Sequence, residues 1–147
     1  MTGKAGKFTA TIKKYGLDIL HANREGKRGG GVAIIYRKDI KVKPISASSI
    51  EYATFEYSHC IIQSMGIKIQ LVCVYRRQVK SLNMFCEEFE NFMESIFYQG
   101  DKTILVGDFN VWVDDANNSD TKKMLKLMNA YGLSQIIKEP THVGDTP

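Results

Sequence analysis

The stretch Thr103-Ile104-Leu105-Val106-Gly107-Asp108-Phe109-Asn110 decides the fold, because it joins an apolar run directly to a polar loop. A short, β-branched apolar run of this length is typical of a strand buried inside a sheet. In open α/β sheets, ligands gather at the carboxyl ends of strands, which is where Asp108 and Asn110 follow. The stretch therefore predicts an α/β fold with a candidate site just beyond residue 107.

Asp108 and Asn110 carry the chemistry expected at such a strand end. If the backbone stays extended, their side chains project to one side while Phe109 packs on the other. The carboxylate can take a proton from water or hold a hard cation, and the amide can donate to a phosphate oxygen. Gly107 lets the backbone turn without a Cβ clash. The alternative interpretation is an Asx-rich turn after a core strand, with no chemical role.

Further strands are expected upstream of this stretch. Apolar or loosely alternating runs predict strands at residues 31–36, 50–57, 60–63 and 67–75. The last two runs flank Ser64-Met65-Gly66, and a glycine between two such runs is typical of a β-hairpin.

Two helices are expected among these strands. Apolar residues recur at three- and four-residue steps from Phe85 to Ile96, which predicts an amphipathic helix with Ser81 as its N-cap. A second helix is expected to begin near Ser119 and to end at Gly132. The order of elements predicts an α/β sandwich with a mixed sheet and helices on the outer faces.

Length and composition fit one soluble domain. The chain has 147 residues, of which 44% are hydrophobic and 24% charged, so residues 1–147 can form a single domain. The sequence shows neither a membrane-length apolar run nor a signal peptide. Cys60, Cys73 and Cys86 are an odd count without metal-site spacing, which favours free thiols. We therefore expect an intracellular protein, nuclear or cytoplasmic, that is not secreted.

The net charge of +4 is unevenly distributed, because lysine and arginine crowd the first third of the chain. Such a basic patch would attract a polyphosphate backbone. A solvated basic surface that keeps the protein soluble is an equally good interpretation.

Several segments, in order along the chain, resemble the endonuclease/exonuclease/phosphatase superfamily. Residues 107–110 look like its Gly-Asp-Phe-Asn motif. Arg24 with Arg28-Gly29-Gly30-Gly31-Val32-Ala33-Ile34, and also Val72-Cys73-Val74-Tyr75-Arg76, are similar to segments of the endonucleases of non-LTR (LINE-type) retrotransposons. Gly132-Leu133-Ser134-Gln135 and Glu139-Pro140-Thr141-His142 resemble a later segment of those enzymes.

This resemblance implies a DNase I-like fold, of which the chain holds part: a four-layer α/β sandwich of two packed mixed β-sheets with helices on the outer faces. It also implies that Asp108 activates the attacking water in phosphodiester hydrolysis. Asn110 would help to hold the scissile phosphate, and Tyr75 would contact it.

The resemblance further implies a cofactor and partners. The cofactor would be Mg²⁺ or Mn²⁺, and DNA would be the substrate of a monomeric endonuclease. Contacts with phosphate or DNA are expected from Arg76, Gln78 and Trp112. The nick would prime a reverse transcriptase region of the same parent polyprotein.

The chain also departs from the family pattern. The family's metal-binding glutamate would precede the segments present, and its late aspartate and Ser-Asp-His ending would follow them. His142 belongs to the Pro-Thr-His segment and is not that histidine, and Gln78 stands where related enzymes often carry an asparagine. We therefore expect a domain truncated at both ends, whose metal ligands are unknown, with Asp108 as a possible one. In isolation, it should be marginally stable and have little or no nuclease activity.

Two other functions stay open. The chain could be a catalytically dead retroelement remnant that at most binds nucleic acid through its basic first third. It could instead be a phosphatase of the same superfamily that acts on small phosphoesters.

Overall fold

The computed structural model describes residues 3–21, 31–46, 51–78, 81–97, 101–111, 115, 117–137 and 139, with side chains from residue 9 onward. The elements in chain order are α1 (Gly3–Lys14), β1 (Leu17–His21), β2 (Ala33–Arg37), β3 (Lys41–Pro44), β4 (Phe55–Ser64), β5 (Ile67–Arg76), α2 (Leu82–Ile96), β6 (Lys102–Asp108) and α3 (Ser119–Ala130). None of the described helices is long and apolar enough to cross a membrane.

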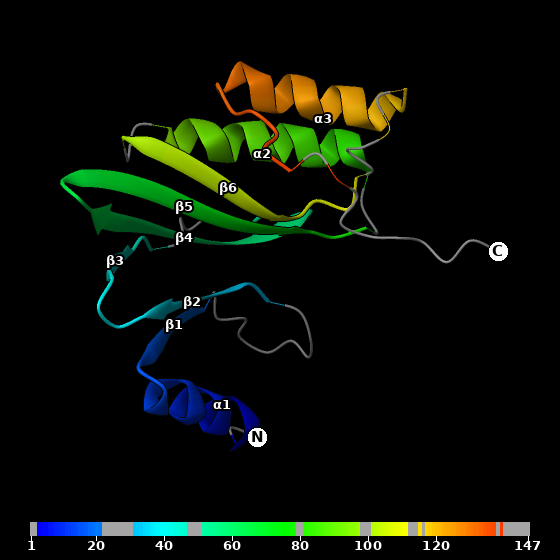
Figure 1. Ribbon diagram of the computed structural model, residues 1–147. Coiled ribbons are helices and arrows are strands. Elements are labelled where there is room, and N and C mark those ends of the chain that lie inside the picture. The colour runs from blue at the N-terminus through cyan, green and yellow to red at the C-terminus, as the bar shows by residue number, and fades with distance from the viewer. Residues whose placement is uncertain are drawn as a thin grey trace.

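The described strands form two sheets. β1 and β2 make an antiparallel pair, and the larger sheet has the order β3-β4-β5-β6. The larger sheet is mixed, because β4 is antiparallel to β3 and β5 whereas β6 is parallel to β5. α2 and α3 cover one face of the larger sheet, while β1, β2 and α1 lie on its other side (Figure 1). The predicted α/β class, with two sheets and outer helices, is confirmed.

The β4–β5 hairpin follows from its turn residues. Met65 and Gly66 have φ angles of 48° and 79°, and positive φ at both central residues is typical of the tight turns that match strand twist. Pairing runs from Ser64 opposite Ile67 to Phe55 opposite Arg76. The predicted hairpin is confirmed, although regular pairing begins at Phe55 and not at residue 50.

The core lies between this hairpin and α2. The helix buries Phe85, Phe89, Phe92 and Ile96, as the periodicity predicts, and burial of each such side chain stabilises the fold by about 1.5–3 kcal/mol. The Ser81 hydroxyl accepts a hydrogen bond from the backbone N–H of Met84 at 3.2 Å, so the predicted N-cap is confirmed.

The second predicted helix is confirmed as α3. The Asn118 side chain caps its first turn, and the chain leaves it at Gly132, whose φ is 68°. Residues 133–137 have no regular secondary structure.

Three elements have no counterpart in the sequence-based expectations: α1, β1 and β3. The N-terminal stretch reads as polar, but residues 3–14 form a helix that contacts β1. In β3, Val42 stands between Lys41 and Lys43, so the strand carries little apolar signal. This strand is therefore stabilised by its hydrogen bonds to β4 and not by a pattern in its own sequence.

The face of β6 turned away from α2 is exposed and apolar. Leu105 packs against the core, so its neighbours Ile104 and Val106 point to the opposite face, where they are 44% and 43% exposed. Within the described residues, β6 is also an edge strand of the larger sheet. An exposed apolar face next to an open edge is an aggregation hazard.

Candidate active site

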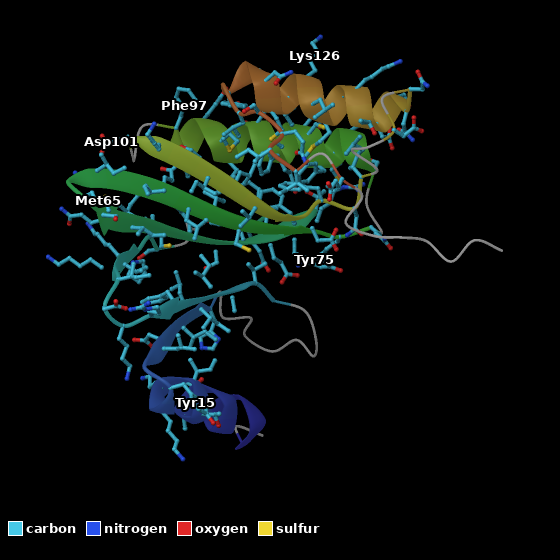
Figure 2. All side chains as sticks on the ribbon, viewed as in Figure 1. Tyr15, Met65, Tyr75, Phe97, Asp101 and Lys126 are labelled. Carbon is cyan, nitrogen blue, oxygen red and sulfur yellow. The ribbon has the colours of Figure 1, made fainter. Side chains whose placement is uncertain are left out.

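The ends of β5 and β6 bring Tyr75 and Asp108 together. These strands are parallel, so their carboxyl ends meet at one edge of the sheet, and the register pairs Tyr75 directly with Asp108. Val74 is buried on the α2 face, so Tyr75 points to the other face and is 36% exposed (Figure 2). Asp108 is exposed as well. A phenol and a carboxylate thus lie open to solvent on strands about 4.8 Å apart.

Gly107 permits this approach of the two strands. A Cβ atom there would lie 1.8 Å from the carbonyl oxygen of Val74, and the φ angle of +151° is one that L side chains rarely adopt. The requirement for glycine therefore comes from the neighbouring strand as well as from the turn.

The chain turns at Asn110, whose φ is 50°. Its backbone N–H donates to Asp108 Oδ1 at 3.0 Å, which closes an Asx turn. The Asn110 amide then donates to the carbonyl oxygen of Arg76 at 2.7 Å. The backbone does not stay extended through residue 110, because this turn carries Asn110 back over the end of β5. Phe109 does pack inward, with its ring 6.4 Å from those of Phe85 and Phe89.

Arg76 and Gln78 hold this turn from β5. Arg76 is only 7% exposed, and its Nη1 donates to the carbonyl oxygens of Phe109 and Asn110 at 3.3 and 3.0 Å. Its guanidinium also lies 5.7 Å from the centroid of the Phe85 ring. Gln78 Nε2 donates to Asn110 Oδ1 at 2.8 Å. Both side chains, for which DNA contacts are expected, thus contact the loop that carries Asn110.

A second set of hydrogen bonds, centred on Glu88 and not expected from the sequence, holds residues 53–54 near this end of the sheet. Glu88 on α2 accepts hydrogen bonds from the backbone N–H groups of Ala53 and Thr54 at 3.1 and 2.9 Å. It also accepts from the Thr54 hydroxyl at 2.6 Å. The Arg77 N–H donates to Thr54 O at 2.8 Å, so Glu88 is linked to the end of β5. One signal was available, because Glu88 adjoins the apolar stripe of the helix.

The charge state of Glu88 fits this role. Burial acts to raise the pKa of its carboxyl, but the hydrogen bonds from Thr54 and Ala53 outweigh burial and hold the pKa below its ordinary value. The carboxylate is therefore the form that stabilises the fold at neutral pH.

The three cysteines lie away from this chemistry. Cys60 and Cys86 are buried and Cys73 is half-buried, all as free thiols. Burial raises the pKa of each thiol, which disfavours the reactive thiolate.

The described residues do not by themselves fit the divalent cation that the resemblance implies. Protein sites for Mg²⁺ use one or two carboxylates together with waters and substrate phosphates. Asp108 and Glu56 are the carboxylates on this face at this end of the sheet, because Glu56 lies opposite Tyr75 in β4. Glu56 is paired with Arg77, and one of the Asp108 oxygens already accepts the Asn110 N–H. No group of three or more histidine, cysteine, aspartate or glutamate side chains that could hold a metal occurs in the described part of the chain.

Several expectations concern residues outside the described ranges. They are Trp112, His142, the glycine-rich segment at residues 24–30 and the Pro-Thr-His segment at residues 140–142.

The comparisons with known proteins indicate a family and a fold for this chain. A family model described as "Endonuclease/Exonuclease/phosphatase family" matches residues 3–146. Among solved structures, the chain is similar to the endonuclease domain of TRAS1, a telomere-specific non-LTR retrotransposon, with a TM-score of 0.63 and 18% identity over 86% of this chain. It is also similar to D. rerio TDP2 humanized by 14 mutations, with a TM-score of 0.54 and 14% identity over 80% of this chain.

The two similar structures extend well beyond the matched region. The chain covers 58% of the TRAS1 domain and 48% of the TDP2 chain. A search of curated protein sequences gives no significant match. At these identities, the structural likeness shows a shared DNase I-like fold.

Proposed function

Because the chain belongs to the endonuclease/exonuclease/phosphatase family, we propose that it supplies part of a site that hydrolyses phosphodiesters in DNA. The observation that carries the proposal is the pairing of Tyr75 with Asp108 at the ends of two parallel strands. The similar TRAS1 domain is an endonuclease of a non-LTR retrotransposon, which supports the same class of reaction here. In such an element, the nick would prime a reverse transcriptase from the same polyprotein.

Asp108 acts as the general base in this proposal. The Asn110 N–H holds one carboxylate oxygen, which orients the group and leaves the other oxygen to take a proton from water. A positioned general base typically contributes about 10²–10⁴ in rate.

Tyr75 and Asn110 position the phosphate. The Tyr75 hydroxyl can donate to a non-bridging oxygen, where negative charge grows in the transition state. One of the two Asn110 amide protons bonds Arg76 O, so the other can reach the phosphate.

The family resemblance implies a divalent cation, Mg²⁺ or Mn²⁺, which would neutralise charge on the phosphate group. The described residues hold no ligand set for it. Ligands beyond Asp108 would come from substrate, water and residues outside the described ranges.

A plasmid-nicking assay with Mg²⁺ tests the proposed function. We expect the chain to nick supercoiled DNA at a low rate that EDTA abolishes. Asp108→Ala and Asp108→Asn should reduce this rate about 10²-fold or more, because each removes the general base. The matched control is Asp120→Asn, which removes an exposed carboxylate in the first turn of α3 and should leave the rate unchanged.

Nicking that survives both EDTA and Asp108→Ala would contradict the proposal. A second result, no nicking above the Asp108→Ala background, would mean that the isolated chain does not complete the site. The second result would favour the alternative function, nucleic-acid binding without catalysis. The observation that keeps this alternative open is that the described residues hold no group of three or more side chains that could bind a metal.

A further inference from the structure

Basic side chains gather at one end of the larger sheet, and Tyr75 and Asp108 lie at its other end. The strand register places Lys41 beside Gln63, and Gln63 beside Lys68. Lys43 follows Lys41 by two residues in β3, so it lies on the same face. These four residues, Lys41, Lys43, Gln63 and Lys68, are called the basic cluster below.

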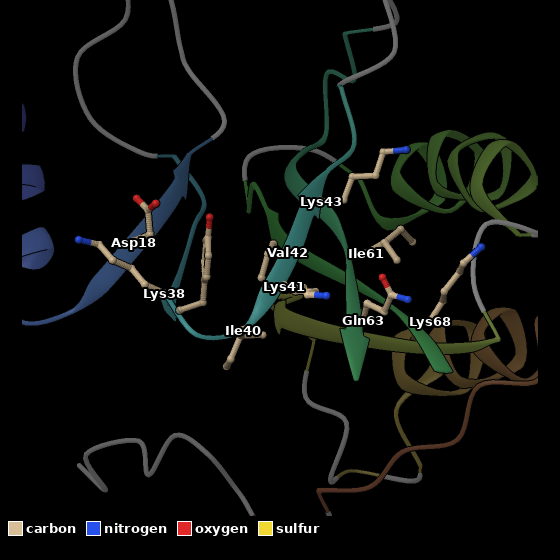
Figure 3. Close-up of a pocket in the computed structure, with 10 residues that line it drawn as sticks. Asp18, Lys38, Ile40, Lys41, Val42, Lys43, Ile61, Gln63 and Lys68 are labelled. Carbon is tan, nitrogen blue, oxygen red and sulfur yellow. The ribbon is translucent and has the colours of Figure 1, made fainter. Parts of the chain in front are cut away.

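The basic cluster lines an open cavity of about 460 Å³ (Figure 3). Ile61 contributes to the same wall, and β3 separates the cluster from a second group of lining residues. That group consists of Asp18, Tyr36, Lys38, Ile40 and Val42. The cavity therefore combines cationic groups, an amide and an aromatic ring.

Positive charge dominates this cavity, which has four lysines and one aspartate among its lining residues. The Asp18 carboxylate accepts the Ile19 N–H. Asp101 lies beside the cavity, where its carboxylate accepts the Lys68 N–H at 2.7 Å.

Ion pairs do not neutralise the basic cluster within the described part of the chain, where the pairs are Arg37–Asp39 and Arg77–Glu56. Lys38 differs from the cluster, because its Nζ donates to Lys13 O. The lysines of the cluster lie on β3 and β5, which flank β4, so an anion bound over Gln63 would be attracted from both sides.

We propose that the basic cluster binds the phosphate backbone of a nucleic acid strand, at a site separate from the catalytic one. The Gln63 amide stands between two lysines, so it can donate to a phosphate oxygen that both ammonium groups attract. Tyr36 supplies an aromatic surface in the same cavity, and nucleic acid bases stack on such surfaces.

This site lies beyond the reach of the catalytic residues. Lys68 and Tyr75 stand on the same strand, roughly 23 Å apart at about 3.3 Å per residue. Nucleic acid bound at the cluster is therefore held whether or not Asp108 acts on it.

The test is fluorescence anisotropy with a labelled single-stranded oligonucleotide in EDTA. The double variant Lys41→Gln/Lys68→Gln should bind at least about tenfold more weakly. Its plot of log K against log salt should be shallower by roughly 1.4, or 0.7 for each lost phosphate contact. The matched control is Lys122→Gln/Lys126→Gln, which removes the same charge from the exposed side of α3 and should change neither quantity (Figure 2).

Gln63→Glu is a second test of the cluster. It puts a negative charge between the lysines, so it should weaken oligonucleotide binding more than Gln63→Ala does. These side chains are exposed, so the variants should keep the wild-type far-UV circular dichroism. Equal losses in the two double variants would overturn the proposal, because net charge alone would then explain binding. Unchanged binding in the cluster variants would also overturn it.

Two further measurements test which ligand binds and whether binding is independent of Asp108. Inorganic phosphate should compete only weakly with the oligonucleotide; competition at matched phosphate concentration would identify a free-phosphate site and exclude the backbone proposal. Asp108→Ala should bind as wild type, so loss of nicking without loss of binding would separate this inference from the proposed function.

Discussion

Gly107 illustrates how a single residue sets the geometry of the site. Its φ angle and its contact with Val74 O both exclude a side chain, and the residue that follows is Asp108. The sequence predicts correctly that a glycine is needed at this point. It does not reveal that the excluded volume belongs to β5, because that contact joins residues far apart in the chain.

We predict that Gly107→Ala lowers the free energy of unfolding by at least about 1–3 kcal/mol, the typical cost of a strained backbone conformation, with the clash adding to it. Gly66→Ala is the control. Gly66 also has a positive φ, but a Cβ there meets nothing within 4 Å. Urea denaturation measures both variants, and an equal loss in the two would show that the Val74 contact carries no cost.

The Asn110 turn shows how far residue-level prediction reaches. The sequence left open an extended strand end and an Asx-rich turn, and the structure has the turn. The bonds to Arg76 and Gln78 could not be predicted, because they depend on how β5 meets β6.

We predict that Arg76→Lys loosens this turn. A lysine keeps the charge but lacks the planar group whose Nη1 reaches the carbonyl oxygens of both Phe109 and Asn110. Amide hydrogen exchange at residues 109–111 should become faster, and stability should fall by about 1–3 kcal/mol. Arg37→Lys, at an exposed ion pair, should leave exchange in the turn unchanged. Unchanged exchange in Arg76→Lys would argue against its positioning role.

At the scale of elements, predictability follows the strength of the local pattern. The hairpin, α2 and α3 carry their own turn, cap and periodicity signals, and all three are confirmed. β3 lacks such signals, because it depends on pairing with β4. The link from Glu88 on α2 to residues 53–54 is equally hidden, since it joins a helix to a segment without regular structure.

This link predicts a pH-dependent stability. The folded-state pKa of Glu88 is depressed, so its contribution is present above the unfolded pKa and is lost as the pH falls through the folded value. Glu88→Gln should lower stability at neutral pH and flatten the acid limb of the stability curve. Thermal unfolding across the acid range measures this, and Glu87→Gln, an exposed neighbour, is the control. A wild-type acid limb in Glu88→Gln would show that other carboxyl groups cause it.

At the scale of the whole molecule, the main asymmetry lies between the two faces of the larger sheet. α2 and α3 cover one face (Figure 1). The other face is partly exposed, at Ile104 and Val106. The local sequence does not indicate this imbalance, because the apolar run 103–107 is typical of a strand buried inside a sheet.

We predict that Val106→Lys reduces self-association, because it places a charge on the apolar face beside the open edge of β6. At each protein concentration, the light scattering and the dye binding of this variant should both be lower than those of wild type. Met65→Lys, at a fully exposed turn position, should change neither. Equal improvement in the two variants would mean that net charge, not this face, governs association.

The parallel pairing of β5 with β6 also determines when the site can exist during folding. The β4–β5 hairpin closes through two residues and can form within about 1–10 μs. Tyr75 meets Asp108 only after the whole of α2 has been placed between their strands, and that larger loop costs more entropy to close. The pairing of Tyr75 with Asp108 is therefore expected to form late in folding. A proteolytic cut between β5 and β6 would spare the hairpin and divide the site between two fragments.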